Sequence, residues 1–208
     1  MRIVLFGATG GLGGRALAEA LARGHTVMAV VRDPSHLTLS HRCLAVVSGD
    51  VRDAHAVAAA IIGHDAVVSC IGPGRLDASR DVISLGMAAM LAGMAASGVR
   101  RIVAVAADGI LQDAAETLLR DAPGYPPPLH AISAEHLRAY ELLLASGARW
   151  TLACPPTLMS GAGTGGYRAE RDYLPEGGTR IAQADVALFI LDELESGAFV
   201  GSRVGVAE

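Results

Sequence analysis

The residues most suggestive of chemistry are three glycines near the N-terminus. Gly7, Gly10 and Gly13 lie between an apolar run and an Ala- and Leu-rich stretch. Between a strand and a helix, such glycines allow a tight turn, an approach of the backbone to a pyrophosphate, and close helix–strand packing. The helix N-terminus then presents free N–H groups to the phosphates. We interpret the loop as dinucleotide-binding rather than as a plain strand–helix turn. The expected contacts are Gly7, Thr9, Gly10, Gly11, Leu12 and Gly13.

A second candidate for cofactor recognition is an arginine at the end of the next apolar run, where Asp33 and Pro34 follow Arg32. A carboxylate at this place accepts a hydrogen bond from the ribose 2′-hydroxyl of NAD, whereas an arginine suits the 2′-phosphate of NADP. Because Arg32 comes first and Asp33 precedes a proline that turns the chain, we expect NADP(H). The alternative is a solvated arginine at a strand end.

The basic residues exclude several chemistries. All 17 are arginines, because the sequence contains no lysine. This excludes Schiff-base enzymes, P-loop kinases and GTPases with their phosphate-binding lysine, and dehydrogenases that rely on a Tyr-x-x-x-Lys pair. The 7 histidines and 3 cysteines show no metal-ligand spacing, so we expect no metal site.

Composition limits the class of protein and its partners. The 208 residues are 51% hydrophobic, which suits a single domain over residues 1–208. A net charge of −4 and 4% aromatic residues argue against a nucleic-acid partner. No apolar run reaches the roughly 18 residues of a membrane span, and the N-terminus does not resemble a signal peptide. Cys43, Cys70 and Cys154 lie far apart and suit reduced thiols, so we expect a cytoplasmic protein.

The elements that position these residues alternate between strands and helices. Continuous apolar runs, typical of strands buried on both faces, occupy Ile3–Phe6, Val27–Val31, Leu44–Val47, Ala66–Ile71, Ile102–Ala106 and Trp150–Cys154. Helices are expected at Leu12–Ala22, Ala54–Ile62, Asp81–Ser97, Ala131–Ser146 and Ala184–Glu195, and a last strand near Phe199–Val204. This pattern predicts an α/β fold, a three-layer doubly wound parallel sheet of the NAD(P)-binding Rossmann type. The order in which strands are added to the sheet should reverse direction between the first and fourth strands.

Two long segments interrupt the alternation, at about 107–130 and 155–180. The first is rich in proline and is expected to hold a short helix near Gln112–Arg120, and the second is rich in glycine. Both follow predicted strands, so both should lie at the carboxyl edge of the sheet over the cofactor. Long loops in a compact domain are usually functional. We therefore expect these segments to form the substrate pocket.

Several motifs together resemble a known family. GATGGLG, VVRDPSHL, GDVRD and HDAVVSCIG are similar to the NAD(P)H-binding, atypical branch of the short-chain dehydrogenase/reductase superfamily. GVRRIVAVAA and GARWTLACPPTL extend the resemblance across essentially the whole chain. Within that branch the chain most resembles the biliverdin-IX-beta reductase/flavin reductase group and its bacterial NADH-flavin reductase relatives.

The resemblance implies further cofactor contacts. It implies that Asp50 and Val51 flank the adenine, although Asp50 also suits a turn or a helix cap. At the ends of the fourth, fifth and sixth predicted strands it implies contacts from Ile71, Gly72, Pro73, Arg75, Ala106, Pro155, Pro156 and Thr157. The fifth strand departs from the superfamily, which often places a serine near the nicotinamide, because this chain has Ala106 and Ala107 there.

The candidate catalytic residue is a histidine. His136 matches a histidine of the flavin reductase group and shares one predicted helical face with Ser133 and Tyr140. The alternative is a surface histidine on an amphipathic helix. The resemblance implies a reductase that passes hydride from NADPH to a small conjugated acceptor, such as a flavin or a quinone-like compound. A non-catalytic NADP(H)-binding regulator and a redox-neutral isomerase or cyclase stay open, as do the monomeric and homodimeric states.

Overall fold

A mostly parallel sheet forms the centre of the computed structural model, which describes residues 1–73, 81–113 and 117–208. Its order is β3-β2-β1-β4-β5-β6-β10-β8. The strands are β1 Arg2–Phe6, β2 Thr26–Val31, β3 Leu44–Ser48, β4 Ala66–Ser69, β5 Arg101–Val105, β6 Arg149–Cys154, β8 Arg168–Arg171 and β10 Ser202–Ala207. Because β1 lies between β2 and β4, the predicted switch of direction between the first and fourth strands is confirmed.

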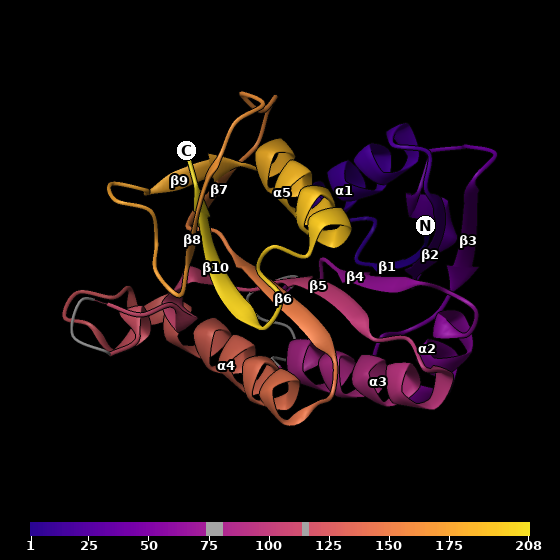
Figure 1. Cartoon of the computed structure of the whole chain (residues 1–208), viewed down its shortest axis with the longest axis horizontal. Coiled ribbons are helices and arrows are strands. Elements are labelled where there is room, and N and C mark those ends of the chain that lie inside the picture. Colours follow the sequence, from indigo (N-terminus) through magenta and orange to yellow (C-terminus); the bar gives the residue numbers. More distant parts are fainter. Residues whose placement is uncertain (74–80, 114–116) are drawn as a thin grey trace.

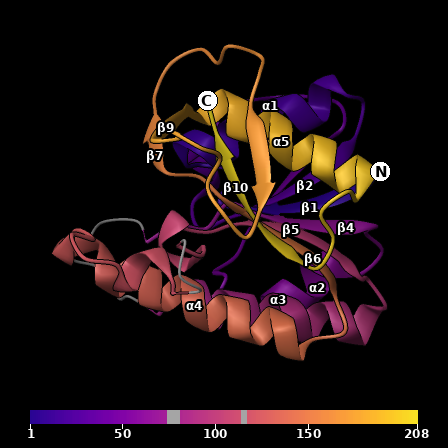
Figure 2. The same ribbon diagram turned by 60° about the vertical axis from the view of Figure 1, so that its left-hand side comes forward.

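Helices cover both faces of this sheet (Figures 1 and 2). On one face α1 packs against α5, and on the other α2 packs against α3 and α3 against α4. The helices are α1 Gly11–Ala22, α2 Ala54–Ile61, α3 Val82–Ser97, α4 His130–Ala145 and α5 Gln183–Ser196. The three-layer doubly wound fold expected from the sequence is therefore confirmed.

The continuous apolar runs follow from burial on both sides of the sheet. In β1, Ile3 and Leu5 pack with the α1 and α5 layer, whereas Val4 and Phe6 pack with the layer of α2, α3 and α4. All four side chains are almost completely buried. A strand with only one buried face would have alternated with polar residues instead.

The first long connection differs from its prediction. No helix forms over the described part of Gln112–Arg120; instead there are 3₁₀ turns at Asp108–Ile110, Leu119–Asp121 and Pro127–Leu129. The backbone N–H of Gln112 donates to the carbonyl oxygen of Asp172 at 2.7 Å, and Gln112 pairs with Leu118 in an antiparallel bridge. Long-range hydrogen bonds have therefore replaced the helical ones that local composition favoured.

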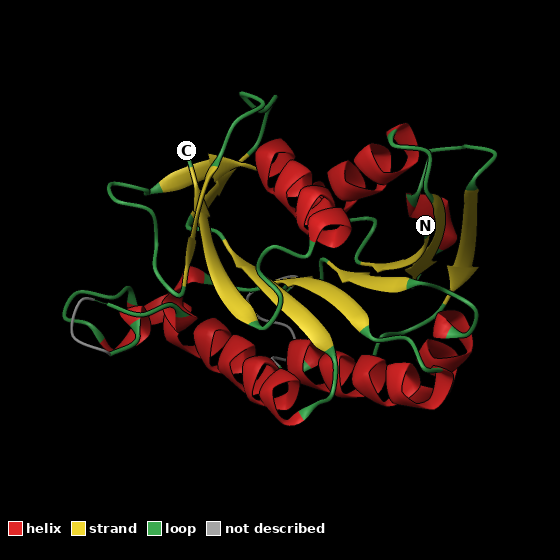
Figure 3. Ribbon diagram, viewed as in Figure 1, coloured by secondary structure: helices red, strands yellow, loops and turns green. Residues whose placement is uncertain are grey.

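The second long connection contains strands that the sequence did not predict. The segments β7 Thr157–Met159 and β9 Arg180–Ala182 form a small parallel pair, and β8 adds an antiparallel edge to β10 (Figure 3). The last strand begins at Ser202 rather than near Phe199, because α5 ends at Gly197 with a φ of +65° and a turn follows.

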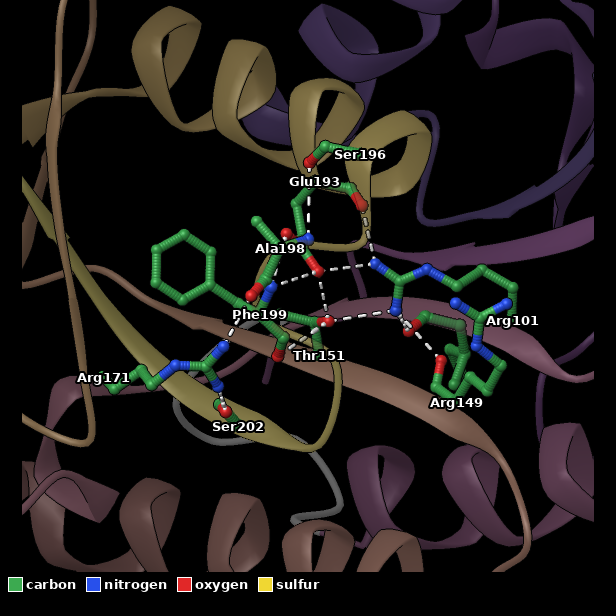
Figure 4. A network of polar contacts seen from close by, with 10 residues as sticks. Arg101, Arg149, Thr151, Arg171, Glu193, Ser196, Ala198, Phe199 and Ser202 are labelled. Carbon is green, nitrogen blue, oxygen red and sulfur yellow. Dashed lines mark hydrogen bonds and ion pairs between the residues drawn. The ribbon is translucent and has the colours of Figure 1, made fainter.

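A buried ion pair ties the starts of β5 and β6 to the end of α5 (Figure 4). The Arg101 guanidinium lies 2.8 Å from the Glu193 carboxylate, and these side chains are 9% and 1% exposed. Thr151 donates a hydrogen bond to the same carboxylate at 2.8 Å, and the backbone N–H of Phe199 donates to it at 3.0 Å. This network lies at the amino edge of the parallel strands and therefore supports the fold from the end opposite the glycine loop.

Candidate functional site

The glycine loop after β1 has the geometry of a phosphate cradle. Gly7 has a φ of +89°, and a Cβ there would lie 2.5 Å from the carbonyl oxygen of Cys70. A Cβ at Gly13 would collide with the carbonyl oxygen of Gly7. A side chain at either position would therefore push α1 away from β1 and β4, so both glycines are required by packing.

Gly10 differs from the other two, because its surroundings are open. It is the N-cap of α1 with φ −80° and ψ 161°, and no side chain caps the helix. Among the residues that the structure describes, a Cβ there would meet only the carbonyl oxygen of Gly7, at 3.4 Å. The first N–H groups of α1 are thus available to an anion, with Thr9 and Gly11 exposed at the rim and Leu12 buried beneath. This cradle fits the pyrophosphate of a dinucleotide.

A residue that sequence reasoning missed covers the start of this helix. Gln183 begins α5, and its side-chain oxygen would lie 2.6 Å from a Cβ on Gly11. The absence of a side chain at Gly11 therefore makes room for an amide beside the phosphate cradle. No local spacing could have indicated this contact, because Gln183 comes from the far end of the chain.

Arg32 and Asp33, which follow β2, differ in the contacts that their side chains make. The Asp33 carboxylate caps a 3₁₀ turn by accepting from the backbone N–H of Ser35 at 2.9 Å and from its hydroxyl at 2.7 Å. These hydrogen bonds with Ser35 lower the pKa of Asp33. Arg32 is exposed, and no hydrogen bond or ion pair engages its guanidinium within the described part of the chain. Arg32 is thus the group free to meet a phosphate.

Asp50 lies in a turn, as the alternative interpretation of this residue expected. Arg52 engages both carboxylate oxygens, at 3.1 and 2.8 Å, and its backbone N–H donates to one of them at 2.9 Å. The hydrogen bonds from Arg52 lower the pKa of Asp50 to about 2. Val51 is buried, and its side chain packs beside Gly86 of α3. Adenine contact by Asp50 and Val51 therefore stays a prediction.

The other expected cofactor contacts lie at the ends of three adjacent strands, with those after β4 expected at the ribose and pyrophosphate and those after β5 and β6 near the nicotinamide. Strands β4, β5 and β6 are parallel neighbours, so their carboxyl ends meet at one edge. Ile71 and Pro73 are half-buried after β4, with Gly72 exposed. After β5, the N–H of Ala106 donates to Ala153 at 2.7 Å. Past β6, Pro155 is buried, Pro156 half-buried and Thr157 exposed. Arg75 lies outside the described residues.

His136 is buried on α4 with 5% of its surface exposed, so the alternative of a surface histidine is wrong. Burial lowers the pKa of His136 to about 4, although the neighbouring charge of Glu135 opposes this. The imidazole is therefore neutral near neutral pH and is not an acid that titrates at the usual pKa of ~6.5. Tyr140, on the same helix, lies 4.8 Å beneath the guanidinium of Arg203 and contacts Trp150, so it is a packing residue.

This burial of His136 predicts a loss of stability in mild acid. Below pH ~6.5 the unfolded chain takes up a proton at His136 that the folded chain refuses until about pH 4, so folding stability should fall as pH falls through this window. The contribution is about 2 kcal/mol between neutral pH and about pH 5. Urea unfolding of wild type and His136→Gln should show that the variant loses this dependence. The exposed-histidine variant His55→Gln should retain it, and equal pH slopes in all three proteins would contradict the assignment.

A hydroxyl pair at the end of β5 was also missed. The oxygens of Tyr125 and Ser133 lie 2.5 Å apart, and Ser133 is completely buried. A Cβ at Gly109, in the turn after β5, would collide with both oxygens. The sequence indicated that the usual hydroxyl at the end of the fifth strand is missing, whereas the structure brings two hydroxyls there from the loop and from α4. Their separation in sequence gave no local signal.

The fold and this site define a Rossmann-type dinucleotide-binding protein. A model of the NAD(P)H-binding family matches residues 7–196, and the chain belongs to this family. The protein therefore binds a nicotinamide cofactor, and its family is oxidoreductase-like. The fit of the glycine cradle to a pyrophosphate agrees with this assignment.

Individual relatives cover the whole domain. The uncharacterized Bacillus subtilis protein YwnB is 32% identical over 210 residues, which cover 94% of this chain and 92% of that protein. The crystal structure of a "putative exported protein" from Burkholderia pseudomallei is 32% identical, with a TM-score of 0.88 and complete coverage of both chains. A "putative NADH-flavin reductase" from Streptococcus pneumoniae is 25% identical, with a TM-score of 0.87, and covers 100% of this chain and 99% of that one.

The described part of the chain contains neither a candidate membrane-spanning helix nor a candidate metal-binding cluster. Within residues 1–73, 81–113 and 117–208, no helix has the length and apolar character to cross a membrane. In the same residues no three His, Cys, Asp or Glu side chains gather as a set that could hold a metal ion.

Proposed function

We propose that this protein is an NADPH-dependent reductase that transfers hydride to a small conjugated acceptor, such as a flavin or a quinone-like compound. The observation that carries the proposal is the glycine cradle after β1, which lies on the same edge of the sheet as the carboxyl ends of the neighbouring strands β4 and β5. The cradle would hold the pyrophosphate. At the carboxyl ends of the next strands, Ile71 after β4 would line the ribose and pyrophosphate, and Ala106 after β5 and Pro155 after β6 would lie near the nicotinamide. The name of the Streptococcus pneumoniae relative supports a flavin-type acceptor.

The cofactor supplies the hydride, and the protein supplies orientation. In this proposal Arg32 binds the 2′-phosphate, the N–H groups at Gly11 and Leu12 bind the pyrophosphate, and Pro156 and Thr157 lie beside the nicotinamide. The proposal gives His136 no proton-transfer role, because its imidazole is neutral and buried. Instead we propose that His136 helps to shape the acceptor side of α4. Cytoplasmic location and a monomeric or homodimeric state are part of the same proposal.

A second candidate function is a redox-neutral reaction, in which the cofactor is retained. The observation that favours it is a "putative epimerase" from Bacteroides thetaiotaomicron, whose structure is 29% identical with a TM-score of 0.88 and covers 99% of this chain and 96% of that one. Function depends on the site rather than on the fold, so the two candidates must be separated by reaction stoichiometry.

The experiment follows NADPH oxidation by purified protein with flavin and quinone acceptors. The reductase predicts steady oxidation, with one equivalent of acceptor reduced for each NADPH consumed. Conversion of a substrate without net NADPH oxidation would favour the redox-neutral enzyme. Binding of NADPH without any turnover would favour a cofactor-dependent regulator instead.

The choice of NADPH over NADH gives a prediction about Arg32. Its loss removes a charge-assisted hydrogen bond to the 2′-phosphate, so Arg32→Ala should weaken NADPH binding by about 1.5–3 kcal/mol and hardly affect NADH. Calorimetric titration of both cofactors measures this. Arg42→Ala, which removes another exposed arginine after the same strand, is the control and should leave both affinities unchanged. A wild type with no preference between the cofactors would show that Arg32 is only a surface residue.

A further inference from the structure

The hydroxyls of Tyr125 and Ser133 share one hydrogen bond, in which either oxygen can be the donor. Ser133 is completely buried, and within the described residues the Tyr125 oxygen, 2.5 Å away, is the partner of its hydroxyl. Because no other acceptor for the buried Ser133 hydroxyl lies in that part of the chain, donation from Ser133 to the Tyr125 oxygen is the arrangement that satisfies both hydroxyls. In this arrangement the phenolic O–H of Tyr125 has no acceptor among the described residues, and the Tyr125 residue as a whole is half-buried.

The place of this pair in the fold connects it with the cofactor site. Gly109 follows β5 in the turn Asp108–Ile110, and it has no room for a side chain because the two oxygens lie against it. Strand β5 lies between β4, whose carboxyl end carries expected ribose and pyrophosphate contacts, and β6, whose carboxyl end carries the expected nicotinamide contacts. The phenol is therefore held at the edge of the sheet where the acceptor would stack.

The turn that supports the pair is itself anchored from the other side of the site. Arg203 of β10 donates to the carbonyl oxygen of Ile110 at 2.5 Å and pairs with Asp172 at 2.9 Å. Asp172 also accepts, through its carbonyl oxygen, the backbone N–H of Gln112 at 2.7 Å. These hydrogen bonds thus hold the C-terminal side of the turn against which the Tyr125 and Ser133 oxygens lie.

The phenol stays protonated over the physiological range. Partial burial, and to a smaller extent the negative charge of Asp108, raise the pKa of Tyr125, although the hydrogen bond with Ser133 opposes this. A neutral phenol is a hydrogen-bond donor to a carbonyl oxygen, and it becomes a proton donor when that oxygen gains negative charge.

We propose that Tyr125 is the proton donor to a carbonyl oxygen of a quinone-like acceptor, and that Ser133 is the residue that positions it. The inference rests on the proposed function. When the acceptor receives hydride from NADPH, the resulting oxyanion takes the proton of the Tyr125 O–H, giving the hydroquinone and NADP⁺. The O–H bond of Tyr125 breaks, and a new O–H bond forms on the product. The Ser133 hydroxyl stabilises the phenolate by its hydrogen bond until water returns the proton.

This step distinguishes quinone-like acceptors from flavins. A reduced flavin can take its proton from water, so its reduction does not need a donor from the protein. The oxyanion formed from a carbonyl gains more from a donor that is already in place. The structure thus favours a quinone-like acceptor within the class of small conjugated compounds.

The test compares Tyr125→Phe, Ser133→Ala and the double variant with wild type, using menadione and FMN as acceptors. Loss of a general acid costs at least ~100-fold in rate, so Tyr125→Phe should lower kcat with menadione by that factor while its FMN rate and NADPH affinity stay near wild type. Ser133→Ala should lose less. If Ser133 acts through Tyr125, the double variant should lose no more than Tyr125→Phe alone.

Two further measurements separate the role of Tyr125 from a structural one. Menadione binding to the NADP⁺-loaded protein, which involves no turnover, should weaken by roughly 3–10-fold in Tyr125→Phe because one hydrogen bond is lost. Gly109→Ala, whose added methyl group collides with both oxygens, should also impair menadione reduction. Gly147→Ala, which meets nothing within 4 Å, is the matched control and should behave as wild type.

The outcomes that overturn the inference are distinct from the one that overturns the proposed function. Equal menadione rates and affinities in wild type and Tyr125→Phe would exclude the proton donor while leaving the reductase intact. Equal losses with menadione and FMN would show a general structural role and would also exclude it. If wild type oxidises no NADPH with either acceptor, the proposed function and the inference both fail.

Discussion

Replacing Gly10 by valine should abolish dinucleotide binding while leaving the fold in place. Gly10 has φ −80° and ψ 161°, an extended conformation that suits a β-branched residue. Within the described part of the chain, a Cβ there meets one atom, the carbonyl oxygen of Gly7, at 3.4 Å. The branched side chain would instead fill the space where backbone and pyrophosphate meet. We expect binding to weaken by at least ~100-fold, or about 2.8 kcal/mol.

Calorimetric titration with NADPH measures the loss of binding, and thermal unfolding measures whether the fold is retained. Gly147→Val, at a glycine with open surroundings between α4 and β6, should bind NADPH normally. Gly13→Val should behave differently from Gly10→Val and destabilise the protein, because its side chain collides with the carbonyl oxygen of Gly7. A Gly10→Val protein that binds NADPH as wild type does would show that this loop does not hold a phosphate.

The second large effect is expected at the amino edge of the sheet, far from the cofactor. Glu193→Gln should lower the free energy of unfolding by about 3–5 kcal/mol, because it leaves the buried charge of Arg101 without its counterion. Thr151 and the N–H of Phe199 would also lose an ionised acceptor. Chemical unfolding measures the loss, and the NADPH affinity of the folded variant should be unchanged.

Two comparisons make this prediction specific. Arg2→Gln breaks an exposed pair with Asp65, whose side chains are 61% and 40% exposed, and should cost about 1 kcal/mol at most. The double variant Arg101→Met/Glu193→Met removes both buried charges and should recover part of the stability lost in Glu193→Gln. If Glu193→Gln costs no more than Arg2→Gln, the buried network does not stabilise the fold.

Much of the fold was predictable because each buried strand is apolar without alternation. Ile3–Phe6 and Trp150–Cys154 contact helices on both faces of the sheet, so nearly every residue of these strands is apolar. Gly7 and Gly13 were predictable for a related reason. The close approach of α1 to β1 leaves no alternative to glycine at these positions, and the strand–helix context makes the pattern specific.

The parts that sequence reasoning missed depend on contacts distant along the chain. The edge strand β8 reads Arg-Ala-Glu-Arg, which has no apolar face, and it forms because β10 offers a free edge. Likewise the N–H of Gln112 bonds to Asp172, which a local preference for helix could not foresee.

The site residues, like the elements of the fold, include some that the sequence could indicate and some that it could not. Arg32 could be singled out because a strand end has a fixed relation to the ribose. The neutral state of His136 could not be predicted from the sequence, because a helical pattern does not determine whether a histidine is surrounded by protein or by water. The proximity of Tyr125 to Ser133 depends on the path of a proline-rich loop, which has no periodicity to interpret.

The most direct test of the central claim follows the hydrogen itself. Single turnovers with NADPH carrying deuterium at either the pro-R or the pro-S position of C4 would be quenched, and the NADP⁺ analysed by mass spectrometry. A reductase that holds the nicotinamide in one orientation beside the carboxyl ends of β5 and β6 predicts complete loss of deuterium from one form and complete retention in the other. Loss from both forms in similar proportion, or no NADP⁺ at all, would contradict hydride transfer in this site.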